Sequence, residues 1–210
     1  MKKRGILIVM SGFSGAGKGT IIKGLQKQYN DYALSISATT RGPRPGEEEG
    51  KSYFFKTRSE FEKMIAQDEL IEYASYVDNY YGTPKVYVEE QLEKGNDVIL
   101  EIEMQGALQV KDNYPEALML FVTTPNAQEL EQRLLGRGTE SEEVISSRMR
   151  QAVKESEKML HYDYLIVNED LDNCIELVHA IIQKEHHRSF RNLEFINQIK
   201  RELKGNLKGE

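Results

Sequence analysis

A glycine-rich segment near the start of the chain constrains the fold more than any other feature of the sequence. It has the Gly-x4-Gly-Lys spacing of a phosphate-binding loop and lies between an apolar run and a helical pattern. Glycines let the backbone curl so that successive N–H groups point at phosphate oxygens, and the positive end of the next helix adds to them. A plain glycine turn is the alternative, but a lysine at this spacing favours an ATP or GTP site. The residues expected to bind the nucleotide are Gly12, Phe13, Ser14, Gly15, Ala16, Gly17, Lys18, Gly19 and Thr20.

One residue of this loop departs from the common motif. Gly19 follows Lys18 at the position where a Ser or Thr hydroxyl usually meets magnesium, and Thr20 comes one residue later. Direct ligation of the metal by the loop is therefore not predicted. Magnesium readily fills its octahedral shell with water and phosphate oxygens, so we still expect Mg²⁺ to accompany ATP.

Four short apolar runs predict buried strands in an α/β fold. Helical patterns lie between them, at Thr20–Tyr29, from an Asn126 cap to Leu135, and at Ser141–Leu160. Strands that alternate with helices predict a parallel sheet covered on both faces, which is a three-layer P-loop fold. The strand runs are Ile6–Met10, Val98–Ile102, Leu118–Val122 and Tyr164–Val167.

Two segments interrupt this alternation. Residues 35–87 are rich in Tyr, Ser, Thr, Gly and Pro, and they contain one clear helix, from Ser59 to Ala66, with a capping-box signature at Ser59 and Glu62. This predicts a small mixed α+β lobe inserted into the core. Residues 136–140 place an arginine between two glycines and predict the hinge of a helical lid at about 126–158. A chain of 210 residues is expected to form one domain, at 4–187, followed by a helical and polar tail at 188–210.

The inserted segment carries two arginines in a stiff loop. Arg41 and Arg44 stand among glycines and prolines, and guanidinium groups hold a phosphate through paired hydrogen bonds. Tyr53 and Tyr81 could add hydroxyl contacts. Two arginines in a loop are more often solvated surface charges, so it is their neighbours that make a monophosphate site the favoured interpretation.

Two carboxylates stand at the end of the second apolar run. Strand alternation places Glu101 and Glu103 on one face near the carboxyl end of the strand, where ligands bind in open parallel sheets. They are expected either to organise magnesium-bound water or to touch the acceptor nucleotide. A solvent-facing pair at the rim of the sheet is the alternative.

Composition limits the partners and the location of the protein. The formal charge of −6 provides no general attraction for nucleic acid or an anionic membrane, and no apolar stretch is long enough to cross a bilayer. Met1–Arg4 is basic, but the apolar run after it ends at Gly12 without a cleavage region, so a signal peptide is not predicted. The single Cys174 is interpreted as a core residue in a reducing compartment. We therefore expect a cytoplasmic protein that binds neither nucleic acid nor membrane.

The ordered motifs together resemble the guanylate kinase family over about residues 4–187. The resemblance implies ATP-dependent phosphorylation of GMP, and also of dGMP, in purine nucleotide metabolism, by a P-loop core, a GMP-binding lobe and an arginine-bearing lid. The motifs that carry it are the phosphate-binding loop and residues 37–47, 70–74, 79–84, 98–106 and 133–140.

The resemblance also implies roles for individual residues. It assigns the GMP phosphate to Arg41, Arg44, Tyr53 and Tyr81. It assigns the guanine base to Ser37, Glu72 and Thr83. Glu103, where the family often has Asp, is placed among the GMP contacts. The residues expected to act in catalysis are Lys18, Arg41, Arg137 and Arg148.

The chemistry of guanine supports the assignment of the base. Guanine presents two N–H donors beside the O6 acceptor, so a carboxylate with nearby hydroxyls complements its edge. Adenine has an acceptor at N1 and would face the same carboxylate unfavourably. Glu72 considered alone would more often be an exposed charge.

Three alternatives are kept. A kinase for another monophosphate or a phosphorylated sugar is disfavoured by Glu72 with Ser37 and Thr83. A noncatalytic phosphopeptide-binding scaffold is disfavoured by Lys18 and the arginines of the lid. A simple P-loop GTPase offers no reason for a second anion-binding lobe. The role of the tail and the oligomeric state are left open.

Overall fold

The computed structural model describes residues 4–76, 78–136 and 141–206 of the chain. Within these residues, the central sheet, sheet A, has five strands that are all parallel. The apolar side chains of the three inner strands are buried almost completely, as expected for strands covered on both faces, whereas Tyr164, Leu165 and Val167 of one edge strand are exposed. The strand order is β2 (Tyr32–Leu34), β7 (Asp97–Glu101), β1 (Leu7–Gly12), β8 (Leu118–Thr123) and β9 (Tyr164–Val167).

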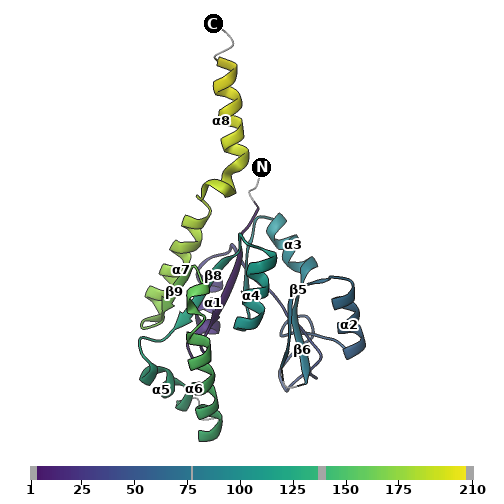
Figure 1. The fold of residues 1–210 in the computed structure, drawn as a ribbon, viewed down its shortest axis with the longest axis vertical. Helices are drawn as coiled ribbons and strands as arrows, with labels where there is room; N and C mark the ends of the chain where they lie inside the picture. Colours follow the sequence, from purple (N-terminus) through teal and green to yellow (C-terminus); the bar gives the residue numbers. More distant parts are fainter. Residues whose placement is uncertain (1–3, 77, 137–140, 207–210) are drawn as a thin grey trace.

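Helices cover both faces of sheet A, which confirms the predicted three-layer fold (Figure 1). α1 packs against α7, whereas α3 contacts β7 and α4 contacts β1. Because the crossover from β1 to β2 runs opposite to that from β7 to β8, right-handed connections place α1 and α4 on opposite faces. These helices are α1 (Lys18–Gln28), α3 (Lys85–Glu93), α4 (Met104–Asn113), α5 (Ala127–Leu135), α6 (Glu142–Ser156) and α7 (Leu171–Glu185).

The inserted segment forms a second, mixed sheet, sheet B. The buried residues Ala38, Phe61 and Leu70 form a small core between this sheet and α2 (Arg58–Ala66). Figure 1 shows α2 on the side of sheet B that faces away from sheet A. The other face of sheet B therefore faces the core of the protein. The strand order is β4 (Phe54–Phe55), β3 (Ala38–Thr39), β6 (Asn79–Pro84) and β5 (Leu70–Tyr76).

The structure corrects three local predictions. The capping box of α2 is formed by Thr57 and Glu60, not by Ser59 and Glu62, because Thr57 Oγ1 accepts from Glu60 N at 3.2 Å and Thr57 N donates to Glu60 Oε2 at 2.7 Å. The helix predicted at 141–160 ends at Ser156, and a short 3₁₀ turn follows at Met159–His161. Strand β7 ends at Glu101, so the prediction that Glu103 lies on it is wrong. By contrast, Asn126 caps α5 as predicted.

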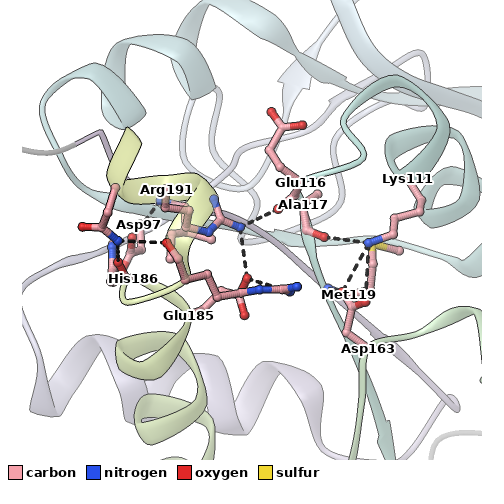
Figure 2. A network of polar contacts seen from close by, with 12 residues as sticks. Asp97, Lys111, Glu116, Ala117, Met119, Asp163, Glu185, His186 and Arg191 are labelled. Carbon is pink, nitrogen blue, oxygen red and sulfur yellow. Dashed lines mark hydrogen bonds and ion pairs between the residues drawn. The ribbon is translucent and has the colours of Figure 1, made fainter. Parts of the chain in front are cut away.

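The tail begins with a turn that is bound to the rest of the protein, and it ends in a helix that extends from this turn. His186 Nε2 lies 2.9 Å from Oδ2 of the buried Asp97, and Arg191 binds Glu185 and the carbonyl of Glu116 (Figure 2). After the turn at Ser189–Asn192, α8 (Leu193–Asn206) extends away from the rest of the protein (Figure 1). Among the described residues, none of the helices has the length and apolar character to span a bilayer.

Candidate active site

The phosphate-binding loop is shaped by close contacts at two glycines. Gly12 has φ of 145°, and a Cβ built on it would lie 2.1 Å from the carbonyl oxygen of Val122 on β8. Gly17, the N-cap of α1, has φ of 96° in the left-handed region. A side chain at either position would strain the backbone and push against its neighbours. The loop therefore curls from the carboxyl end of β1 into the start of α1, as the sequence predicted.

Lys18 is the first residue of α1 and its amine lies over the loop. Nζ donates to the carbonyl oxygens of Gly12, at 2.7 Å, and Phe13, at 3.2 Å. A small rotation of this long side chain would bring its charge to a phosphate that is bound by the N–H groups of the loop. Lys18 thus lies where its predicted role requires.

Asn168, which is not among the predicted site residues, holds the main chain of the loop in place. It follows β9 and is buried, and its Nδ2 donates to the carbonyl oxygen of Ala16 at 2.8 Å. A Cβ on Gly17 would lie 2.3 Å from the same nitrogen. Arg133 of α5 donates to the main-chain oxygen of Asn168 at 2.9 Å. A polar residue directly after the last parallel strand was the available signal, since ligands bind at that edge of such sheets.

Glu101 lies beside the loop at the position where the motif lacks its hydroxyl. A Cβ on Gly19 would be 3.7 Å from both carboxylate oxygens of Glu101. Desolvation raises the pKa of Glu101, Lys18 opposes this, and Glu103 adds to it. Glu103 is exposed and occupies the N-cap position of α4, with extended backbone. Glu103 therefore acts on Glu101 across the turn between β7 and α4 rather than along one strand.

Helix α6, which lies in the segment predicted to act as a lid, contacts the loop through an arginine. Arg148 is partly buried, and its Nη1 donates to Ser14 Oγ at 2.5 Å. This hydrogen bond places a guanidinium group above the phosphate-binding loop. Arg137, the second predicted arginine of the lid, lies outside the described residues.

Four of the residues predicted to bind the acceptor nucleotide lie on one face of sheet B. Strand pairing sets Ala38 opposite both Gly82 and Phe54, so the next pair along places Ser37 opposite Thr83 and beside Tyr53. Residues two apart on a strand point to the same face, which adds Tyr81 to this side. The rings of Tyr53 and Tyr81 lie 6.2 Å apart. The face that carries them is the one opposite α2.

Glu72 is the buried charge of this face. Only 6% of it is exposed, and Thr83 Oγ1 donates to its Oε1 at 2.8 Å. Burial raises the pKa of Glu72 to about 7, although hydrogen bonds from the side chain and main chain of Thr83 lower it. A buried carboxyl group with a single polar neighbour is costly unless a ligand supplies further donors. Glu72 and Thr83 are thus brought together as predicted.

Arg41 is preorganised as an anion clamp. Its guanidinium group binds Glu47 through two hydrogen bonds of 2.8 and 3.0 Å, and it lies 5.3 Å from the centre of the Tyr53 ring. The pKa of Glu47 is lowered by this pair and by the main-chain N–H of Arg44. Glu47 presents to Arg41 the same fork of two oxygens as a phosphate would. The side chain of Arg44 is exposed.

The fold and the site define a class of protein. The core carries a phosphate-binding loop, a second lobe holds Arg41 and the buried carboxyl group of Glu72, and an arginine of α6 reaches the loop. This is the arrangement of a P-loop nucleotide kinase, which binds a phosphate donor and an acceptor on separate lobes.

Comparison with known proteins identifies the family within this class. The family model described as guanylate kinase matches residues 4–185. A guanylate kinase of Caldanaerobacter subterraneus subsp. tengcongensis is 50% identical over 96% of this chain and 98% of its own length. One of Lactococcus lactis subsp. lactis is 50% identical over 92% of this chain and 95% of its own. The crystal structure of guanylate kinase from Anaplasma phagocytophilum superposes with a TM-score of 0.74 at 30% identity and covers 91% of each chain. The chain belongs to the guanylate kinase family.

Proposed function

We propose that the protein transfers the γ-phosphate of ATP to GMP and releases ADP and GDP. The observation that carries the proposal is the buried carboxyl group of Glu72, bound to Thr83 on the lobe that faces the phosphate-binding loop. It accepts the N1–H and N2–H of guanine, while the hydroxyl of Ser37 donates to O6, because the hydroxyl of Thr83 already donates to Glu72. Arg41, Arg44, Tyr53 and Tyr81 hold the acceptor phosphate. The pocket reads base and phosphate, so dGMP is also an acceptor.

Catalysis in this proposal rests on positioning and on neutralising charge. The acceptor phosphate oxygen is already anionic near neutral pH, so transfer needs no strong protein base. The obstacle is the repulsion between two anionic substrates. Lys18, Arg41, Arg137 and Arg148 offset it, and closure of the lid excludes the water that would hydrolyse ATP.

Magnesium fits the site as a companion of ATP. Among residues 4–76, 78–136 and 141–206, no three His, Cys, Asp or Glu side chains gather as a metal site. The carboxylate of Glu101 against Gly19 is a hard oxygen donor of the kind Mg²⁺ prefers, and water and phosphates complete its shell. When bound, the ion neutralises phosphate charge. Glu101 and Thr20 would hold its water ligands, and Glu103 contacts the acceptor.

In this proposal, each predicted segment of the chain has its own role. Residues 35–87 bind the acceptor, residues 126–158 act as the lid, and both belong to the unit at 4–187, with 188–210 as its tail. A cytoplasmic location and the absence of a nucleic-acid partner stay predictions from composition. The substrates are ATP and GMP.

Replacing Glu72 tests the proposed function at the base pocket. Glu72→Gln keeps the volume but turns one acceptor into a donor that opposes a guanine N–H. Loss of this charge-assisted contact is expected to weaken GMP binding by about 2 to 4 kcal/mol. The affinity for ATP should change little, because Glu72 lies on the other lobe. Calorimetry with both nucleotides on folded variant and wild type checks this, and unchanged GMP affinity would show that another residue reads the base.

The pKa of Glu72 predicts how the affinity for GMP depends on pH. Its value of about 7 lies above the ordinary 4.5, so the pocket is largely protonated below neutrality and loses an acceptor. GMP is expected to bind about tenfold more weakly at pH 6 than at pH 8 from this group alone. The same shift means that the pKa change of Glu72 costs no stability below about pH 4.5, that the cost grows as the pH rises from 4.5 to about 7, and that it is constant at higher pH.

The phosphate of GMP also titrates in this range, so the measurement needs a control. Glu72→Gln retains the titration of the phosphate and lacks that of the carboxyl group. The difference between the two pH profiles of the KM for GMP isolates Glu72. Parallel profiles would contradict the predicted titration.

A further inference from the structure

Helix α4 of the core packs directly against the carboxyl group that reads the base. A Cβ built on Gly106 would lie 2.3 Å from Oε2 and 3.0 Å from Cδ of Glu72. Both residues are buried, and Oε1 of the same carboxyl group is held by Thr83. Glu72 therefore sits between Thr83 on one side and the bare backbone of Gly106 on the other, with little room to move.

A second residue of α4 fixes the strand that carries Glu72. The side-chain amide of Gln109 pairs with the main chain of Tyr73: Tyr73 N donates to Oε1 at 3.2 Å, and Nε2 donates to Tyr73 O at 2.9 Å. β5 is an edge strand of sheet B and hydrogen-bonds only to β6 within that sheet. Gln109 thus takes the place of a neighbouring strand at the residue next to Glu72.

The strand has a local reason to need this support. The pairing of β5 with β6 shifts register between Leu70 and Tyr73, so the ladder is irregular where Glu72 lies. Gly106 and Gln109 are three residues apart and share one face of α4. The same helix face therefore fixes the backbone beside Glu72 and limits the position of its side chain.

We propose that Gly106 and Gln109 are positioning residues that set guanine specificity by holding the Glu72 carboxylate in register with the base. The inference rests on the proposed function and adds a determinant from the core to the lobe that binds the acceptor. Neither residue belongs to the groups proposed to contact the nucleotide, so both act through Glu72. A displacement of about 1 Å is enough to misalign a two-point hydrogen bond, which makes the contact with the 2-amino group the most sensitive readout.

Gly106→Ala tests the proposal through substrate discrimination. Alanine favours a helix more than glycine does, so the variant has no local reason to unfold. The new methyl group must displace Oε2 of Glu72. We expect the KM for GMP to rise by about 10-fold to 100-fold. Inosine monophosphate lacks the 2-amino group, so the ratio of kcat/KM for GMP over this analogue should fall by about tenfold, while the KM for ATP stays as in wild type.

Gly205→Ala is the matched control. It makes the same change within helix α8, where a Cβ meets nothing within 4 Å, and it should behave as wild type. Gln109→Leu is the second variant, because it keeps the bulk and removes both hydrogen bonds to Tyr73. It should lower the same ratio by about threefold, which corresponds to the loss of a modest hydrogen bond.

The possible results distinguish a failure of this inference from a failure of the proposed function on which it rests. A fall in the GMP preference of either variant, with the KM for ATP unchanged, supports the proposal. A purely structural role would lower the thermal midpoint and affect GMP, inosine monophosphate and ATP alike, and it would overturn the proposal, as would an unchanged preference in both variants. If Gly106→Ala does not fold, Gln109→Leu decides. Wild type that forms no GDP from GMP would overturn the proposed function itself, and the inference with it.

Discussion

Lys18→Ala is expected to lower kcat by about a thousandfold or more. The side chain lies across the phosphate-binding loop and supplies a full charge that the main-chain N–H groups cannot replace. That charge is needed most as the γ-phosphate leaves ADP, so the loss belongs to the transfer step. GMP should bind as in wild type, because Glu72 and Arg41 lie on the other lobe. Rapid-quench measurement of the transfer rate, with calorimetry for GMP, checks both parts.

Lys27→Ala provides the comparison for this experiment. Lys27 is exposed in the last turn of the same helix, α1, so the variant removes a lysine without touching the loop. It should retain the wild-type rate. Normal ATP turnover in Lys18→Ala, or a selective loss of GMP affinity, would contradict the division of the site into donor and acceptor lobes.

Arg148→Ala is expected to reduce kcat by about 100-fold to 1,000-fold with little change in the affinity for ATP. Arg148 extends from α6 to Ser14 of the loop, so we expect its charge to act on the transferring phosphate when ATP occupies the loop. Such a contact stabilises the transition state more than the initial complex. Steady-state kinetics together with a binding isotherm for ATP separates the two effects.

Arg150→Ala is the matched control on the same helix. Arg150 is exposed and its Nη1 donates to Ser146 Oγ at 3.0 Å, away from the loop. The variant should lose little activity. If Arg148→Ala loses affinity for ATP and keeps kcat, Arg148 is an ordinary binding residue. The same test applied to Arg137 asks whether the second predicted arginine of the lid acts in the same way.

The sequence was most informative where a local pattern has one physical solution. The phosphate-binding loop follows from glycines and a lysine at fixed spacing, and the buried strands follow from apolar runs such as Leu118–Val122. The capping box of α2 shows the limit of such reasoning. Thr57 and Ser59 both stand three residues before a glutamate, and only the fold decides that Thr57 caps the helix.

The residues that hold the phosphate-binding loop and Glu72 in place could not be predicted in the same way. Asn168 reaches Ala16 across 152 positions of the chain, and Gly106 meets Glu72 because a helix of the core packs on an edge strand of the other lobe. These contacts depend on tertiary packing between segments whose local sequence says nothing of each other. Glu103 was misplaced for a related reason: a strand that ends at Glu101 and turns into α4 looks, in sequence, like one that continues.

The most direct test of the account is ADP release from ATP across a panel of nucleoside monophosphates. Wild-type protein with Mg²⁺ should release ADP rapidly with GMP and form GDP in equal amount. AMP, UMP and CMP should be far poorer acceptors, because their bases do not present two adjacent donors to Glu72. Equal turnover of AMP or UMP would contradict the assignment of guanine as the base that this site reads.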